Sequence, residues 1–134
     1  MIAEQKAVLA ANAAFYDAFA ARDVQGMDEL WARRVPVVCI HPGWQPLHGR
    51  DAVIESWRQI LEGPAPPAIR CSREMVYLLG AAAFVVCHED VHGAELVATN
   101  VFVLEDGSWR MVQHHAGGVA HPEADSTPPP GSLH

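Results

Sequence analysis

The sequence predicts an α+β fold in which helices cover one face of an antiparallel sheet. Apolar residues recur at helical spacing near the N-terminus and again after Gly49, whereas β-branched and aromatic runs fill the second half of the chain. Asp106-Gly107 lies between two such runs and is a strong hairpin signal, because Gly tolerates the positive φ that a tight turn requires. Helices therefore come first, and strands follow.

Three helices are expected before the main strands. The first spans residues 3–22, where the residues at helical spacing are Val8, Leu9, Asn12, Phe15, Tyr16 and Phe19. Asp23 is a suitable cap for a short second helix that carries Met27, Leu30 and Trp31. The third begins after Gly49 and stops at Gly63-Pro64, with a face formed by Val53, Ile54, Trp57, Ile60 and Leu61.

The remaining segments are predicted to be strands. A short strand spans residues 35–40 and ends in a turn at residues 41–44. After a Pro-rich linker the sheet resumes at residues 69–78 and continues as two hairpins with turns at His92-Gly93 and Asp106-Gly107. Four consecutive antiparallel strands result.

Two-residue turns predict which side chains share a face of the sheet. The first hairpin pairs Glu89 with Leu96 and Cys87 with Ala98. The second pairs Ala98 with His115 and, two residues further along, Asn100 with Gln113. Glu89, Cys87, Asn100, Gln113 and His115 then share one face. A shift of one residue would exchange the two faces.

The opposite face is expected to be apolar, with His114, Thr99 and Arg110 near it. Its apolar members are Phe84, Val86, Val97, Val101, Val103 and Val112. Three helices are too few to cover both faces, and a sheet does not expose so much apolar area to water. We therefore expect a homodimer through this convex face.

Composition limits the class of protein. The chain has 134 residues, 50% of them apolar, which suits one domain over residues 1–119 with a Pro-rich C-terminal tail over residues 120–134. A net charge of −7 with nine Lys and Arg argues against a nucleic-acid partner. No segment resembles a membrane span or signal peptide, so no membrane partner and a cytoplasmic location are expected. Cys39, Cys71 and Cys87 are interpreted as reduced core residues.

The sequence resembles the nuclear transport factor 2-like superfamily, in its SnoaL-like and ketosteroid-isomerase-like branch. The segments that carry the resemblance cover most of residues 5–119; they are residues 14–31, 39–44, 47–57, 87–90, 98–102 and 107–116. The resemblance implies a cone-shaped curved sheet closed by the three helices. This fold serves isomerases, dehydratases, epoxide hydrolases, polyketide cyclases and non-catalytic modules, so it does not by itself assign an activity.

The candidate site is the helix-facing side of the sheet. Glu89 and His115 are the expected catalytic pair, because burial raises a carboxyl pKa towards neutrality and a nearby histidine can exchange a second proton. Expected binding residues are Tyr16, His41, Trp44, Trp57, Cys87, Asn100 and Gln113. The expected ligand is a small apolar organic molecule that undergoes proton transfer, dehydration or hydrolysis. The alternative is a non-catalytic ligand-binding or dimeric interaction module.

Each assignment has a structural alternative. Glu89 could pair with Arg50 or Arg70 at the rim, His115 could bond a backbone carbonyl, and His41 could stabilise its own turn. His41, His115 and Glu89 could also form a two-histidine, one-carboxylate metal set, but no closely spaced His pair supports it. We expect no metal and no cofactor.

Overall fold

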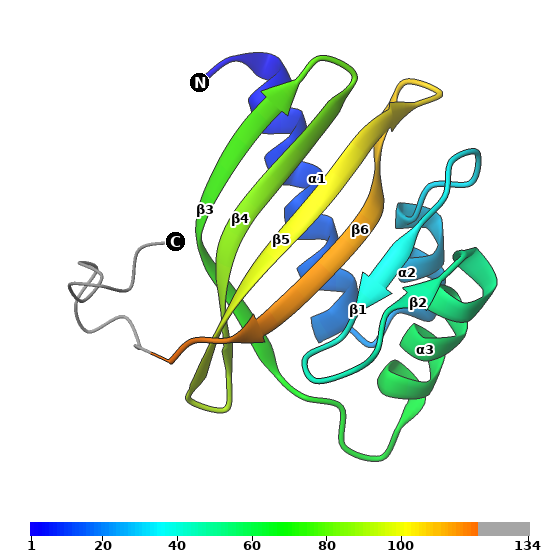
Figure 1. The fold of residues 1–134 in the computed structure, drawn as a ribbon, viewed down its shortest axis with the longest axis vertical. Helices are drawn as coiled ribbons and strands as arrows, with labels where there is room; N and C mark the ends of the chain where they lie inside the picture. Colours follow the sequence, from blue (N-terminus) through cyan, green and yellow to red (C-terminus); the bar gives the residue numbers. More distant parts are fainter. Residues whose placement is uncertain (121–134) are drawn as a thin grey trace.

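A curved sheet with helices on one side organises the computed structural model, which describes residues 1–120 (Figure 1). All of the predicted tail except residue 120 lies outside the described residues. The elements are α1 (Ala3–Ala20), α2 (Val24–Leu30), β1 (Val38–Ile40), β2 (Leu47–His48), α3 (Arg50–Glu62), β3 (Ile69–Leu79), β4 (Ala82–Val91), β5 (Ala94–Glu105) and β6 (Ser108–Gly118). The α+β prediction is confirmed. Within residues 1–120 no helix is long and apolar enough to cross a membrane.

Six strands form one sheet in the order β2-β1-β6-β5-β4-β3. The sheet curves around α1 and stays open, with β2 and β3 as its edges (Figure 1). The four long strands are antiparallel, as predicted, but β1 runs parallel to β6. The short strand β2 pairs with β1 and was not predicted.

The first hairpin has the predicted register, whereas the second does not. Glu89 pairs with Leu96 and Cys87 with Ala98. In the second hairpin Phe102 pairs with Met111, as a two-residue turn at Asp106-Gly107 requires, but the next pair is Val101 with Gln113. Val112 is therefore an extra residue in β6, a β-bulge. Because side chains alternate along a strand, the bulge exchanges the faces of all following residues of β6.

Helix α1 covers the inner face of the sheet because its apolar stripe packs against β3, β4 and β6. Val8, Phe15 and Phe19 on this stripe are buried, as are Ala83 and Val85 of β4, which point toward the helix. The stripe also carries Asn12 and Tyr16, both buried. The helix thus presents polar groups to the sheet from within an apolar interface.

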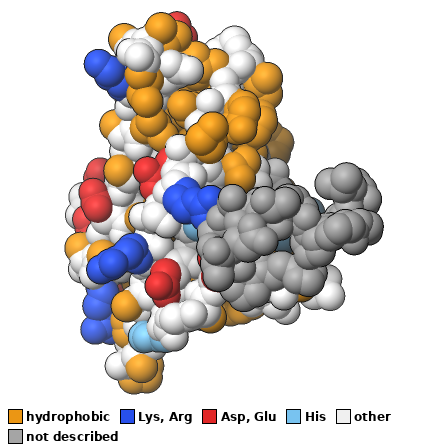
Figure 2. Space-filling view, turned by 90° about the vertical axis from the view of Figure 1, so that its left-hand side faces the viewer, with side chains coloured by type: hydrophobic (Ala, Val, Ile, Leu, Met, Phe, Trp, Pro, Cys, Tyr) orange, Lys and Arg blue, Asp and Glu red, His pale blue; other side chains and the backbone are white. Residues whose placement is uncertain are grey.

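The outer face of the sheet carries the expected apolar residues, which are half-buried in the single chain. Near the end of β3, Met75, Tyr77 and Leu79 are exposed, and the Tyr77 ring stacks on Phe84 of β4 at 4.8 Å between centroids. Figure 2, which views the molecule from the β3 side, shows hydrophobic side chains gathered in its upper half. We call Met75, Tyr77, Leu79 and Phe84 the outer apolar patch.

Candidate functional site

Glu89 and Tyr16 form the shortest polar contact of the inner face. Glu89 lies at an inward position of β4 and is 1% exposed. The Tyr16 hydroxyl on α1 donates a hydrogen bond to Glu89 Oε2 at 2.5 Å, and it lies 3.3 Å from the Sγ atom of Cys87. Cys87 and Glu89 point inward because side chains alternate along β4, and Tyr16 lies on the face of α1 that packs on the sheet. The contacts therefore join groups that are more than 70 residues apart in the sequence.

Asn100 of β5 connects this pair to a histidine. Its Nδ2 group donates to Asn12 Oδ1 at 2.8 Å and to the Tyr16 hydroxyl at 3.1 Å. Its Oδ1 atom lies 2.6 Å from Nδ1 of His114, so this ring nitrogen is the donor. The hydrogen bonds run in one direction, from His114 through Asn100 and Tyr16 to Glu89. We call Asn12, Tyr16, Cys87, Glu89, Asn100 and His114 the inner polar cluster.

Burial controls the protonation of this cluster. Desolvation raises the pKa of Glu89 above its ordinary value, although the hydrogen bond from Tyr16 opposes the rise. Burial, followed by the nearby Glu89 charge, raises the pKa of the Tyr16 hydroxyl, so Tyr16 stays a donor. Desolvation lowers the pKa of His114 to about 3, so its ring is neutral near pH 7. A buried carboxyl with a raised pKa is suited to taking up and returning a proton.

A second group of predicted residues lies beside the cluster. His41 Nε2 is 2.9 Å from Ser56 Oγ, and Ser56 donates to the carbonyl of Val53 at 2.7 Å. Ser56 therefore accepts the bond from His41. The His41 ring contacts Trp57 at 4.6 Å and Trp44 at 4.7 Å between centroids.

Burial lowers the pKa of His41 to about 4, which keeps the ring neutral near pH 7. The side-chain bond to Ser56 differs from the turn-stabilising bond considered from the sequence.

The structure thus divides the predicted site residues. Tyr16, Cys87, Glu89 and Asn100 belong to the inner polar cluster. Trp57 is buried in the second group, while Trp44 is 46% exposed at its rim. The groups meet at His114, whose ring lies 5.9 Å from that of Trp57.

The predicted pairings of His115 with Ala98 and of Gln113 with Asn100 are wrong. His115 pairs with Thr99 and is exposed, and Gln113 pairs with Val101 on the outer side. His114 is buried on the inner face instead of lying near the outer one. The bulge at Val112 is the reason, because one extra residue exchanges inward and outward positions. Glu89 and His115 therefore do not face each other across the interior.

Asn12, Ser56 and His114 are site residues that sequence reasoning missed. Asn12 could have been found from the sequence, because a polar amide in the middle of an apolar helical stripe needs a buried hydrogen-bond partner. Ser56 sits beside Trp57 on α3 and gave no comparable signal. His114 was assigned to the other face by the unbulged register.

Two cavities border the inner polar cluster. One, of 330 Å³, lies between α1 and β3 and is lined by residues that include Asn12, Tyr16 and Cys71. The other, of 610 Å³, lies at the ends of the long strands and includes Glu89 and Leu96 in its wall. Tyr16 thus lines the first cavity, and Glu89 lines the second together with residues of the outer face such as Ser72 and His88.

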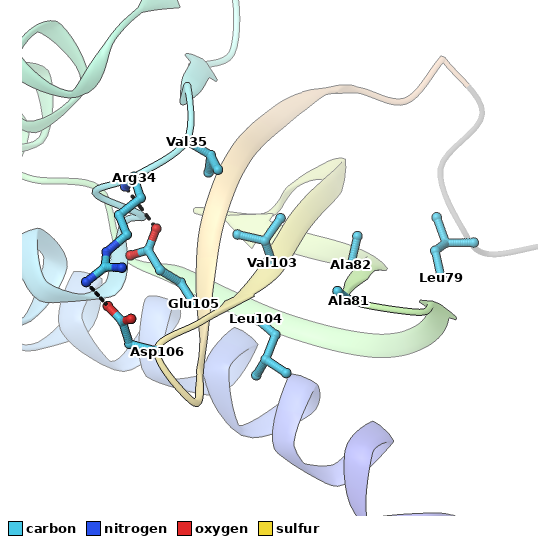
Figure 3. Close-up of a pocket in the computed structure, with 9 residues that line it drawn as sticks. All are labelled: Arg34, Val35, Leu79, Ala81, Ala82, Val103, Leu104, Glu105 and Asp106. Carbon is cyan, nitrogen blue, oxygen red and sulfur yellow. Dashed lines mark hydrogen bonds and ion pairs between the residues drawn. The ribbon is translucent and has the colours of Figure 1, made fainter.

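A third cavity, of 520 Å³, lies at the opposite end of the long strands (Figure 3). Val103 and Leu104 form part of its wall, and an ion pair of 3.1 Å joins Arg34 to Asp106 at its edge. The Glu105 carboxylate accepts from the backbone N–H groups of Arg33 and Arg34. No predicted site residue lines this cavity.

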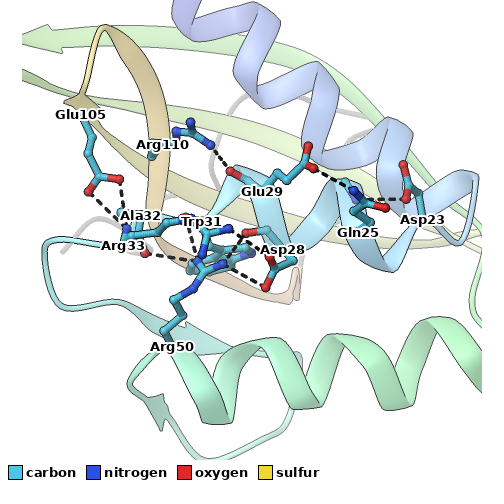
Figure 4. A network of polar contacts seen from close by, with 11 residues as sticks. Asp23, Gln25, Asp28, Glu29, Trp31, Ala32, Arg33, Arg50, Glu105 and Arg110 are labelled. Carbon is cyan, nitrogen blue, oxygen red and sulfur yellow. Dashed lines mark hydrogen bonds and ion pairs between the residues drawn. The ribbon is translucent and has the colours of Figure 1, made fainter.

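A polar network outside the sheet fixes α3 against α2 (Figure 4). Arg50, the first residue of α3, donates to the carbonyls of Trp31 at 2.8 Å and Asp28 at 2.6 Å, and it forms an ion pair with Asp28 at 2.9 Å. Arg50 therefore does not pair with Glu89 as considered from the sequence. Arg50 instead supplies hydrogen bonds to carbonyl groups at the C-terminal end of α2, where a positive charge is also favourable.

Metal ligation finds no support in the described part of the chain. Among residues 1–120 no group of three or more His, Cys, Asp and Glu side chains could hold a metal ion. His41, Glu89 and His115, the set considered from the sequence, do not converge.

Solved structures similar to this chain share its fold over nearly its whole length. A protein of the NTF2-like family from Streptomyces avermitilis, named as a candidate dehydratase, is 30% identical with a TM-score of 0.81, covering 88% of this chain and 97% of its own. A candidate calcium/calmodulin-dependent protein kinase type II association domain from Thiobacillus denitrificans is 34% identical with a TM-score of 0.70, covering 83% of this chain and 94% of its own.

A curated relative and a family model extend the comparison. The F-box protein SKIP8 of Arabidopsis thaliana is 28% identical over 116 residues, which is 85% of this chain and 50% of the relative. This chain thus spans about half the length of that relative. The model of the SnoaL-like domain matches residues 8–120. With the curved sheet, the three helices and this match in agreement, the chain belongs to the SnoaL-like family of NTF2-like proteins.

Proposed function

We propose that this protein binds a small, largely apolar organic molecule at the inner polar cluster and transfers a proton to or from it through Glu89. The observation that carries the proposal is the Glu89 carboxyl, which is almost fully buried and bonded to Tyr16, a residue that lines the 330 Å³ cavity between α1 and β3. Burying a carboxylate is unfavourable unless it is compensated. Within residues 1–120 Glu89 takes part in no ion pair, and a buried carboxyl of this kind favours a functional role.

The reaction class we favour is dehydration of a β-hydroxycarbonyl compound. Glu89 in its ionised form takes the proton from the carbon next to the carbonyl, and the β-hydroxyl then leaves with that proton as water. The hydrogen bond from Tyr16 orients the Glu89 carboxyl and stabilises its ionised form before substrate binds. The candidate dehydratase from Streptomyces avermitilis, similar over most of this chain, supports this class. Isomerisation by proton transfer and hydrolysis use the same groups.

The test is dehydration of a panel of simple β-hydroxyketones, including 4-hydroxybutan-2-one, read as growth of the enone absorbance. We expect turnover by the parent chain and a loss of at least 100-fold in Glu89→Gln, which keeps size but cannot take up the proton. Glu62→Gln is the matched control, because Glu62 is an exposed carboxylate at the end of α3. Equal rates in the parent chain and in Glu89→Gln would contradict catalysis by Glu89.

The second candidate function is a non-catalytic module that binds a ligand or assembles with a second copy. The outer apolar patch favours assembly, because Met75, Tyr77 and Leu79 are exposed together on an edge strand. The candidate association domain from Thiobacillus denitrificans supports a second copy as the occupant. A homodimer through the outer face is compatible with catalysis inside the cone. The cytoplasmic location stays a prediction from the sequence.

A further inference from the structure

Asn12 is the member of the inner polar cluster whose side-chain nitrogen has no strong acceptor. It is 1% exposed, lies on α1 one turn before Tyr16, and forms part of the wall of the 330 Å³ cavity between α1 and β3. Its Nδ2 group donates to Cys71 Sγ at 3.8 Å, and within residues 1–120 no oxygen or nitrogen atom accepts a bond from it. A buried donor in a cavity wall is therefore paired only with sulfur.

The hydrogen-bond network fixes which way the Asn12 amide faces. Tyr16 donates its one hydroxyl proton to Glu89 Oε2, so the Asn100 atom 3.1 Å from the Tyr16 oxygen is the donor Nδ2. The same Nδ2 group lies 2.8 Å from Asn12, whose facing atom is therefore the acceptor Oδ1. The Nδ2 group of Asn12 is the other end of this amide and faces Cys71 on β3.

Cys71 is a poor partner for this nitrogen. A thiol sulfur is a weak acceptor, and its contact with Asn12 Nδ2 is long. The Cys71 thiol gives its own proton to Glu74 Oε1, 3.5 Å away. A ligand oxygen in place of the sulfur would form a stronger bond, and a buried donor gains most from such a partner. The Asn12 amide thus favours a ligand that carries an oxygen acceptor.

The rest of the cavity wall limits the chemistry of that ligand. Its volume of 330 Å³ falls in the range of small-molecule sites. The apolar lining residues are Leu9, Ala13, Ala20 and Ile69. Asp17 and Glu74 supply carboxylates, and among the described residues that line this cavity there is no Lys or Arg. Because like charges repel, the wall suits an apolar molecule with an oxygen acceptor and no negative charge.

We infer that the cavity between α1 and β3 is the substrate site, that its substrate is an uncharged carbonyl compound, and that Asn12 Nδ2 donates to the carbonyl oxygen. This inference rests on the proposed function, which supplies the carbonyl group. It adds the cavity that is used, the residue that recognises the carbonyl and the exclusion of acids. Tyr16 lines the same cavity and holds Glu89, so the bound carbonyl lies on the side of α1 that carries the bond to the carboxyl.

The experiment compares two probes of equal shape that undergo no dehydration. One is the ketone 4-phenylbutan-2-one, and the other is 2-methyl-4-phenylbut-1-ene, in which a CH₂ group replaces the carbonyl oxygen. Calorimetric titration of the full chain gives the affinity for each. Asn12→Leu should weaken ketone binding by about threefold to tenfold, the effect of one hydrogen bond, and leave alkene binding unchanged. Equal losses for both probes, or no binding of the ketone to the parent chain, would overturn the inference.

Two measurements on the parent chain do not depend on how Asn12→Leu folds. The infrared carbonyl stretch of the bound ketone should move to lower wavenumber, because a hydrogen bond weakens the C=O bond. Cys71 is a free, half-buried thiol in the cavity wall, so the ketone should slow its alkylation by iodoacetamide. A bound ketone that changes neither the stretch nor the alkylation rate would lie elsewhere, and the inference would be wrong.

Acids test the role of Asp17 and Glu74. The anion 4-phenylbutanoate should bind the parent chain at least about tenfold more weakly than the ketone. The double variant Asp17→Asn with Glu74→Gln should narrow this difference, whereas Glu62→Gln, outside the cavity, should keep it. Equal affinities of the parent chain for acid and ketone would overturn the exclusion of acids.

The binding measurements need no turnover, so the two proposals fail separately. Ketone binding that depends on Asn12 in a chain without dehydratase activity would remove the proposed function and keep the carbonyl site. Dehydration that depends on Glu89, together with ketone binding that ignores Asn12, would remove this inference and keep the proposed function.

Discussion

Asn100 and His114 lie opposite each other on β5 and β6, with Nδ1 of His114 2.6 Å from Oδ1 of Asn100. This contact exists because β6 has one extra residue at Val112. It supplies the first donor of a chain of hydrogen bonds that ends at Glu89. A neutral, buried histidine at one end and a buried carboxyl at the other give the protein opposing dependences on pH.

The first prediction concerns His114 and acid. Its pKa falls from 6.5 in the unfolded chain to about 3 in the folded one, so the unfolded state binds more protons between these values. The free energy of unfolding should decrease as pH falls from 6.5 towards 3, by up to about 1.4 kcal/mol per pH unit from this group. Urea unfolding at several pH values measures the slope. His114→Gln should reduce the slope and leave the part that His41 contributes, whereas His48→Gln, at an exposed position on β2, should leave the slope unchanged.

The second prediction concerns Glu89, for which the sign is reversed. Its folded pKa is raised, so its contribution to stability is present below the unfolded value of 4.5 and is lost as pH rises through the folded value. The free energy of unfolding of Glu89→Gln, relative to that of the parent, should therefore be higher at pH 8 than at pH 4. At either pH its free energy of unfolding should stay within about 2 kcal/mol of the parent. A larger loss at pH 8 would make Glu89 a structural residue.

The third prediction separates the Tyr16 hydroxyl from its ring. Tyr16→Phe keeps the aromatic contact with Phe15 but removes the donor to Glu89 and the acceptor of Asn100. We expect a loss of about 1–3 kcal/mol, the usual effect of leaving buried polar groups unpaired. Tyr77→Phe is the control, because Tyr77 is exposed on the outer face. In thermal or urea unfolding, equal effects of the two changes would argue against the bond from Tyr16 to Glu89.

The fourth prediction concerns Arg50, which joins the start of α3 to the end of α2. Arg50→Met should lower the free energy of unfolding by about 2–3 kcal/mol, because hydrogen bonds from a charged donor to two carbonyls and the partly buried ion pair with Asp28 are lost. Arg58→Met should change it by less than about 0.5 kcal/mol, since the pairs of Arg58 are exposed. If both variants lost a similar free energy of unfolding, the effect would come from removing a positive charge in general and not from the contacts of Arg50.

The fifth prediction tests the outer apolar patch. If a second copy covers it, the parent chain should be a dimer in light scattering at micromolar concentration. Leu79→Lys should shift the equilibrium to monomer, because a charge would be buried at the contact. Leu104→Lys changes another exposed leucine, outside the patch, and should leave the dimer intact. A monomeric parent chain would contradict the proposed assembly.

The sequence by itself determined the class of fold and most of its elements. The period of apolar residues predicted α1, α2 and α3, and Asp106-Gly107 located the hairpin between β5 and β6. The turn at His92-Gly93 also gave the register of β4 with β5, so the inward position of Cys87, Glu89 and Asn100 was predictable. These features depend on interactions between near neighbours, which leave a regular pattern in the sequence.

Only the tertiary structure decided which histidine enters the interior. The bulge at Val112 exchanges His114 and His115 between the two faces of the sheet. A pattern of period two does not mark where one extra residue enters, because apolar residues occur on both faces of β6. The bulge is defined by the pairing of β6 with β5, and the histidine that it turns inward packs on Phe15 of α1, so both features depend on segments far apart in the chain.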